Sequence, residues 1–224
     1  MLEKPLYTHP NPKKLIELAI KGAIEEEKTY GPVFRDLYIK YALQYAAKKF
    51  GETPKGEIKT LDQILEFLVS ISDRHPDALN AVVYSGSKAE SELQGRSGAA
   101  ARIGLMGLSK NLVREPSGKE RNVDVDQLLA TYQKTLLQLE VANCEVGYRK
   151  NSDESVDVIW PNCHMKDGCR MAYDEGALKR AIGGLQCLAC AGMLQILKLL
   201  SGFDWDYELL EFDKPYCLAR VFMV

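Results

Sequence analysis

The residues best suited to chemistry are four cysteines that lie in two pairs between positions 160 and 193. Cys163 and Cys169 bracket a polar turn in WPNCHMKDGCRM, and Cys187 and Cys190 form a C-x-x-C in the apolar segment GGLQCLACAGM. On a helix, residues three apart face the same side, so the second pair presents its thiols together. Two such pairs can supply four thiolates in tetrahedral geometry, which suits zinc or an iron–sulfur cluster. We therefore expect a metal site at these cysteines, with His164 as a further candidate ligand.

Two other interpretations of the same cysteines stay open. Five residues separate Cys163 from Cys169, whereas the usual zinc-ribbon spacing has two. Cysteine also packs as a small hydrophobic side chain, so CLACAGM is equally suited to contact a sheet. A dithiol redox pair at Cys187 and Cys190 is less favoured, because such pairs act at helix N-termini that lower the thiol pKa.

Composition argues against several other kinds of function. The 224 residues carry a net charge of -2 and a pI near 6.0, so no strongly basic surface for nucleic acid is expected. The start of the chain lacks the apolar region of a signal peptide, and Gln186, Gln195 and Lys198 interrupt the longest apolar run. We expect a cytoplasmic protein without a membrane span. The chain has three histidines, and no Ser–His–Asp or paired-carboxylate motif is recognisable. Few residues are therefore candidates for acid–base catalysis.

The first part of the chain is predicted to be helical. Pro12 suits the first position of a helix, which should break near Gly31. The next segment, VFRDLYIKYALQYAAKKF, predicts a second helix with Gly51 as its C-cap. Thr60 with Gln63 forms a capping box for a third helix, LDQILEFLVSISDR.

The middle of the chain predicts further helices and then a hairpin. Residues 77–113 keep a helical pattern with many small residues and a break near 95–98. Asp124 with Gln127 caps the helix VDQLLATYQKTLLQLEV. The segments NCEVGYR and SVDVIW, joined by a polar turn, predict a β-hairpin in which Cys144 is a core residue.

The last part predicts a helix between strands. A helical stretch is expected to begin at Asp174 or Glu175 and to resume, after two glycines, as CLACAGMLQILKLLSG. The segments DWDYELLEF and YCLARVFMV predict a final pair of strands, with Cys217 alternating among apolar residues. The predicted fold class is α+β, with an antiparallel sheet packed on helices. We divide the chain into an N-terminal helical extension, 1–76, and an α+β ligand-binding domain, 77–224.

The C-terminal part resembles the 4-vinyl reductase domain, also described as a hydrocarbon-binding domain. The resemblance rests on a glycine-bearing helix, either 82–95 or 97–112, and on the hairpin at 143–160. It also rests on the apolar helix beginning near Cys187, a strand ending in Glu211, and Cys217 in the last strand. One departure is the segment FDKPYC, which is shorter than the cysteine-rich hairpin tip usual in that family and supplies one cysteine. Domains of this family are similar in fold to subunits of a transport-particle tethering complex.

The resemblance implies a pocket for an apolar small molecule between the helices and the sheet. The aromatic and methionine side chains that we expect to line it are Tyr84, Met106, Tyr132, Tyr148, Trp160, Met193 and Trp205. Since the tethering-complex relatives pair through helices, the resemblance also implies a homodimer.

These observations predict a ligand-binding or sensory domain with a cysteine-ligated zinc or iron–sulfur site. One alternative is a small reductase or redox partner that works through the cysteine cluster. Another is a structural adaptor in which the cysteines only pack.

Overall fold

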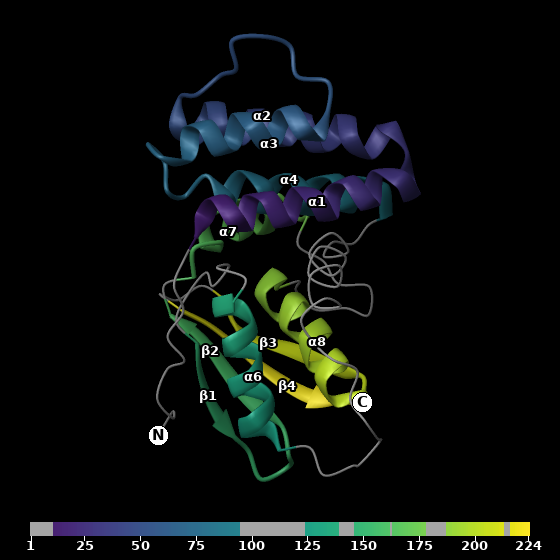
Figure 1. Ribbon diagram of the computed structural model, residues 1–224, viewed down its shortest axis with the longest axis vertical. Helices are drawn as coiled ribbons and strands as arrows, with labels where there is room; N and C mark the ends of the chain where they lie inside the picture. The colour runs from purple at the N-terminus through teal and green to yellow at the C-terminus, as the bar shows by residue number, and fades with distance from the viewer. Residues whose placement is uncertain (1–10, 95–123, 139–145, 162, 178–186, 213–215) are drawn as a thin grey trace. The chain divides into compact units, whose positions relative to one another are not determined.

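The chain folds into two compact units, each of which is described by itself (Figure 1). The computed structural model describes residues 11–94, 124–138, 146–161, 163–177, 187–212 and 216–224. Of these, unit 1 holds 124–163 and 189–224 with the gaps just given, together with residue 11. Unit 2 holds 12–94, 164–177 and 187–188. Each unit is therefore assembled from segments that are far apart in the sequence.

Unit 2 is a bundle of helices. Its described helices are α1 (Pro12–Tyr30), α2 (Pro32–Phe50), α3 (Leu61–Ser72), α4 (Leu79–Gln94) and α7 (Lys166–Asp174). The α4 helix packs against α2 and α7 and also touches α1, which lies against α3. The core between them is formed by large apolar side chains that are fully buried, among them Ile16, Phe34, Tyr38, Tyr45, Ile64 and Leu68.

The predicted start of α1, end of α2 and start of α3 are confirmed. Pro12 opens α1, and Gly51 ends α2 in the left-handed conformation (φ 69°), where its N–H reaches the last carbonyls of the helix. The Thr60 hydroxyl accepts from the Gln63 N–H at 3.2 Å, and the Gln63 side chain accepts from the Thr60 N–H at 3.2 Å. These local hydrogen bonds satisfy backbone groups that a helix end leaves unpaired.

Unit 1 combines an antiparallel sheet with two helices. The strands are β1 (Gly147–Lys150), β2 (Val156–Pro161), β3 (Trp205–Glu211) and β4 (Tyr216–Met223), in the order β1-β2-β4-β3. Neighbouring strands all pair antiparallel, with an irregularity between Leu209 and Glu211. The helices are α6 (Val125–Gln138) and α8 (Leu188–Ser201). The predicted hairpin, apolar helix and final pair of strands are thus confirmed, and the fold class is α+β.

The two faces of the sheet differ in chemistry because side chains alternate along each strand. On β2, Val156 and Val158 point toward α6 and α8, with which they share a group of apolar contacts. Asp157, between them, points to the other face, yet its side chain is only 1% exposed.

Arginine side chains cover Asp157. Arg220 of β4 donates to it with Nε–Oδ1 2.8 Å, and Arg149 of β1 with Nη2–Oδ2 2.7 Å. Asn151 adds a hydrogen bond at 3.0 Å. The hydrogen bond from Arg220, more than any other contact, holds the pKa of Asp157 well below its usual value. The β3 residue opposite Arg220 is Glu208, so charges of alternating sign cross all four strands.

The structure corrects the predicted turn between Cys163 and Cys169. Residues 166–174 form α7, and this helix ends at Asp174, where a helix was predicted to begin. Gly176, at φ 71°, follows its end. The helix α7 was not predicted because it contains Gly168, and glycine in a helix costs about 1 kcal/mol relative to alanine. Packing on α4 compensates: the Gly168 N–H donates to the Asn80 side chain at 2.8 Å.

The predicted boundary at 76/77 lies between α3 and α4, within unit 2. The division into an extension and a ligand-binding domain stays a prediction. In the described parts of the chain, none of the helices combines the length and apolar character that crossing a membrane requires.

Candidate ligand-binding site

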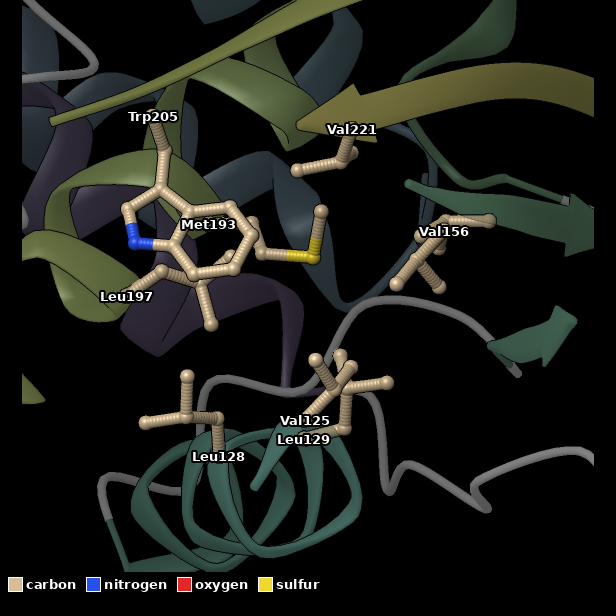
Figure 2. A pocket seen from close by; sticks show the side chains of 9 residues that line it. Val125, Leu128, Leu129, Val156, Met193, Leu197, Trp205 and Val221 are labelled. Atoms are coloured by element: carbon tan, nitrogen blue, oxygen red, sulfur yellow. The ribbon is translucent and has the colours of Figure 1, made fainter. Parts of the chain in front are cut away.

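An apolar cavity lies in unit 1 between the sheet and the helices α6 and α8. All the side chains that line it are apolar: Val125, Leu128, Leu129, Val156, Val158, Met193, Leu197, Trp205 and Val221. Figure 2 shows Met193 extending from α8 toward the centre of the group, with the α6 side chains on one side and the strands on the other. The enclosed volume is about 10 Å³, close to the space of a single water molecule. The side chains therefore almost fill the site.

Two of the predicted pocket residues, Met193 and Trp205, line this cavity. Tyr132 on α6 and Trp160 on β2 are buried in the same unit, although neither lines it. Tyr148 on β1 donates its hydroxyl proton to Asp126 of α6 at 2.7 Å. The prediction for Met106 falls outside the described residues.

Tyr84, the remaining predicted pocket residue, lies on α4 in unit 2. Its hydroxyl donates to Glu175 at 2.8 Å, and its ring meets that of Tyr41 edge-on, with centroids 5.9 Å apart. Lys88 also pairs with Glu175, at 3.2 Å. Together with Lys48 and other neighbours, these aromatic residues line an open hollow of about 580 Å³. Its lining includes the charged side chains of Lys48 and Glu175, and all of its lining residues belong to unit 2.

The aliphatic lining residues were not predicted from the sequence, although their spacing indicates buried faces. Val125, Leu128 and Leu129 recur at helical intervals, and Val156 and Val158 alternate as strand residues do. Such patterns show which side of an element is buried. They do not show that the buried sides of two helices and a sheet enclose a space.

Trp160 adds a polar group next to the apolar lining. It follows Val156 and Val158 on the same face of β2, and β4 places Cys217 opposite it. Its side chain is buried, and within the described part of the chain its indole N–H has no acceptor. A buried donor without a partner costs about 1–3 kcal/mol, so a ligand atom that accepts this hydrogen bond would be favoured.

The four cysteines predicted to bind metal belong to different elements. Cys163 follows β2 and Cys190 lies on α8, both in unit 1, whereas Cys169 on α7 and Cys187 belong to unit 2. Cys169 and Cys190 are buried, Cys163 and Cys187 are half-buried, and none of the five described cysteines forms a disulfide. His164 follows Cys163 in a turn.

Within the described residues, the structure contains no group of three or more His, Cys, Asp or Glu side chains placed to hold a metal ion. The zinc or iron–sulfur site therefore stays a prediction, since the cysteines lie in units described separately. Iron, zinc and sulfide analysis of protein purified without oxygen tests it directly: one zinc, or iron with sulfide, per chain is the expected result. Protein free of all three would contradict it.

The resemblance also singled out Glu211 and Cys217. Glu211 ends β3 and accepts a hydrogen bond from the Tyr216 hydroxyl at 2.8 Å. Cys217 is buried on β4, as expected for a core strand residue. Cys144 lies outside the described residues.

Comparison with known proteins finds no match: no family model, no curated protein and no solved structure matches this chain. Membership of the 4-vinyl reductase family therefore stays a prediction from the sequence pattern.

Proposed function

We propose that unit 1 is a ligand-binding or sensory domain whose ligand is a small apolar molecule held between α6, α8 and the sheet. The observation that carries the proposal is the cavity lined by nine apolar side chains. Burial of apolar surface would supply the binding free energy, about 25 cal/mol for each Å² removed from water. The order of hairpin, apolar helix and final strands, from which the resemblance was drawn, supports the same function.

The ligand must displace side chains because the cavity is nearly full. Met193 is suited to this, since its unbranched side chain has several rotatable bonds and adapts to irregular spaces. It points into the centre of the cavity (Figure 2), so a change of its rotamer enlarges the space. The indole N–H of Trp160 has no acceptor among the described residues, so it favours a ligand that carries one hydrogen-bond acceptor beside its apolar body.

Binding of an apolar fluorescent probe tests this function. The chain has two tryptophans, Trp160 and Trp205, and both lie in unit 1. Addition of cis-parinaric acid is expected to quench tryptophan emission by energy transfer and to saturate at one probe per chain. Organic extraction of the purified protein, followed by mass spectrometry, then identifies a natural ligand.

A charge at the edge of the cavity is expected to abolish probe binding. Leu128 lines the cavity but is half-buried, so Leu128→Glu should fold while it places a carboxylate beside the ligand. Because burying a charge in apolar surroundings is costly, we expect the affinity for cis-parinaric acid to fall at least about tenfold.

The matched control is Leu210→Glu. Leu210 is a leucine of β3 in the same unit, it is 39% exposed, and it does not line the cavity. This variant should bind the probe as the wild type does. Equal loss in both variants, or no saturable binding by the wild-type protein, would contradict the proposed site.

A further inference from the structure

Unit 2 contains two glutamates buried inside the helix bundle. Glu26 of α1 is 0% exposed and Glu90 of α4 is 2% exposed. Glu26 is the middle member of three consecutive glutamates, of which Glu25 is exposed and Glu27 half-buried. It occupies the buried side of α1, three residues after Ala23, where an apolar side chain would be expected. A carboxylate at such a position is expensive unless something compensates for its charge.

Among the described residues, no hydrogen-bond donor compensates for the charge of Glu26. Neither of its carboxylate oxygens has a hydrogen-bond donor among the described residues. Glu90 is near enough to hydrogen-bond with it if a proton lies between the two carboxyl groups. Burial first, and then the charge of Glu90, raise the pKa of Glu26 to about 9.

Two hydroxyl groups close to the pair are also unsatisfied. Tyr38 of α2 is fully buried, and burial raises the pKa of its hydroxyl. The charges of Glu90 and Glu26 lie close enough to raise this pKa further. Ser85 is a neighbour, but its hydroxyl donates to the Val82 carbonyl at 3.0 Å. Within the described residues, the Tyr38 hydroxyl meets no partner with hydrogen-bond geometry.

The second hydroxyl belongs to Ser87. It precedes Glu90 by three residues on α4 and so lies on the same side of that helix. Its oxygen is buried and, in the described part of the chain, has no partner. Buried polar atoms in folded proteins are nearly always satisfied, so several unsatisfied oxygens in one region indicate a missing ligand.

Carboxylate and hydroxyl oxygens favour a cation as the ligand. A single shared proton would join one oxygen of Glu26 to Glu90, but it would leave the other Glu26 oxygen and both hydroxyl groups unmatched. A small cation can contact several oxygens at once and offset the charge of Glu26. Carboxylate and hydroxyl oxygens without sulfur or imidazole are ligands of hard cations such as Mg²⁺, Mn²⁺ and Ca²⁺.

We propose that Glu26 and Glu90 bind one divalent cation with a preference for oxygen ligands between α1 and α4, with the hydroxyl groups of Tyr38 and Ser87 as neutral ligands. This site differs from the predicted cysteine site in its ligands and in the metals it favours. It is independent of the apolar cavity, which belongs to unit 1.

Titration of the full-length protein with Mn²⁺ tests the proposal. The chain is first stripped with EDTA and dialysed, and free Mn²⁺ is followed by its electron paramagnetic resonance signal. We expect saturation at one Mn²⁺ per chain, competition by Mg²⁺ or Ca²⁺, and a higher unfolding temperature of the helical unit with bound metal. Glu26→Gln and Glu90→Gln should each weaken Mn²⁺ binding at least about tenfold.

Both glutamine variants are expected to fold, because an amide resembles a protonated carboxyl group in shape and removes a buried charge. The matched control is Glu25→Gln, which changes the exposed neighbour and should bind Mn²⁺ as the wild type does. The proposal is overturned if the wild-type chain shows no saturable binding, in which case the pair holds only a proton. It is also overturned if Glu26→Gln binds Mn²⁺ as tightly as Glu25→Gln.

Discussion

Replacement of Asp157 by alanine is expected to lower the free energy of unfolding of unit 1 by about 1–3 kcal/mol. The loss would be this large because two arginine side chains and Asn151 donate to a carboxylate that is almost fully buried. Without the carboxylate, Arg149 and Arg220 would face each other across β2 with no negative charge between them. Tryptophan fluorescence during urea unfolding measures the effect, since both tryptophans lie in unit 1.

The control for this prediction is Glu208→Gln, which removes the exposed acidic end of the same row. Exposed ion pairs contribute about 0–1 kcal/mol, so this variant should unfold close to the wild-type midpoint. If Asp157→Ala behaved like Glu208→Gln, the buried carboxylate would not stabilise the sheet.

The same carboxylate predicts how the stability of unit 1 depends on pH. Its pKa in the folded protein is lowered from an ordinary value of 3.8, so the folded state holds fewer protons than the unfolded state in acid. The stabilisation is therefore complete above about pH 5 and is lost as the pH falls below 3.8 toward the folded-state pKa. Asp157→Ala should show a flatter dependence in this range than the wild type.

Gly168→Ala is expected to destabilise unit 2 by about 2 kcal/mol or more. A Cβ at Gly168 would lie 2.5 Å from the backbone oxygen of Asn80 and 3.1 Å from its Cα, so α7 would have to move away from α4. That movement would also strain the hydrogen bond from the Gly168 N–H to Asn80. The helix preference of alanine offsets only about 1 kcal/mol of this cost. Thermal unfolding followed by circular dichroism measures the change.

Gly86→Ala is the matched control, because Gly86 also lies inside a helix of unit 2. A Cβ there would meet the Tyr38 ring at 3.7 Å, an ordinary van der Waals distance. This variant should be neutral or stabilised by up to about 1 kcal/mol. If Gly168→Ala and Gly86→Ala changed the free energy of unfolding equally, there would be room for a Cβ between α7 and α4, and the prediction would be contradicted.

The helix ends could be predicted from the sequence because their causes are local. The capping box of α3 is formed by Thr60 and Gln63, which are only three residues apart. Gly51 ends α2 because glycine adopts positive φ without strain. The helix α7 could not be predicted in the same way. The glycine in its first turn, Gly168, is tolerated because the side chain of Asn80, 88 residues earlier in the chain, accepts its N–H. No local sequence pattern indicates that contact.

The candidate sites also depend on contacts between distant segments, which the sequence pattern does not reveal. Met193 and Trp205 were predicted as pocket residues and line one cavity, but Tyr84 belongs to the other unit, because side-chain type does not reveal which surfaces meet. The burial of Glu26 was not predicted, because its residue type is the same as that of Glu25 and Glu27. Helical spacing from Ala23 places position 26 on the buried side of α1, but a glutamate is not expected there.

The position of α7 in the chain has a consequence for protein synthesis. The helices α1 to α4 leave the ribosome first, while α7 is encoded between β2 and α8, within the stretch that builds unit 1. Until the ribosome passes Asp174, the surface of α4 around Asn80 has no helix to cover it. The helical bundle therefore cannot be completed co-translationally before most of unit 1 has been made. Until then, the part of α4 that α7 contacts in the folded protein stays uncovered by α7 on the nascent chain.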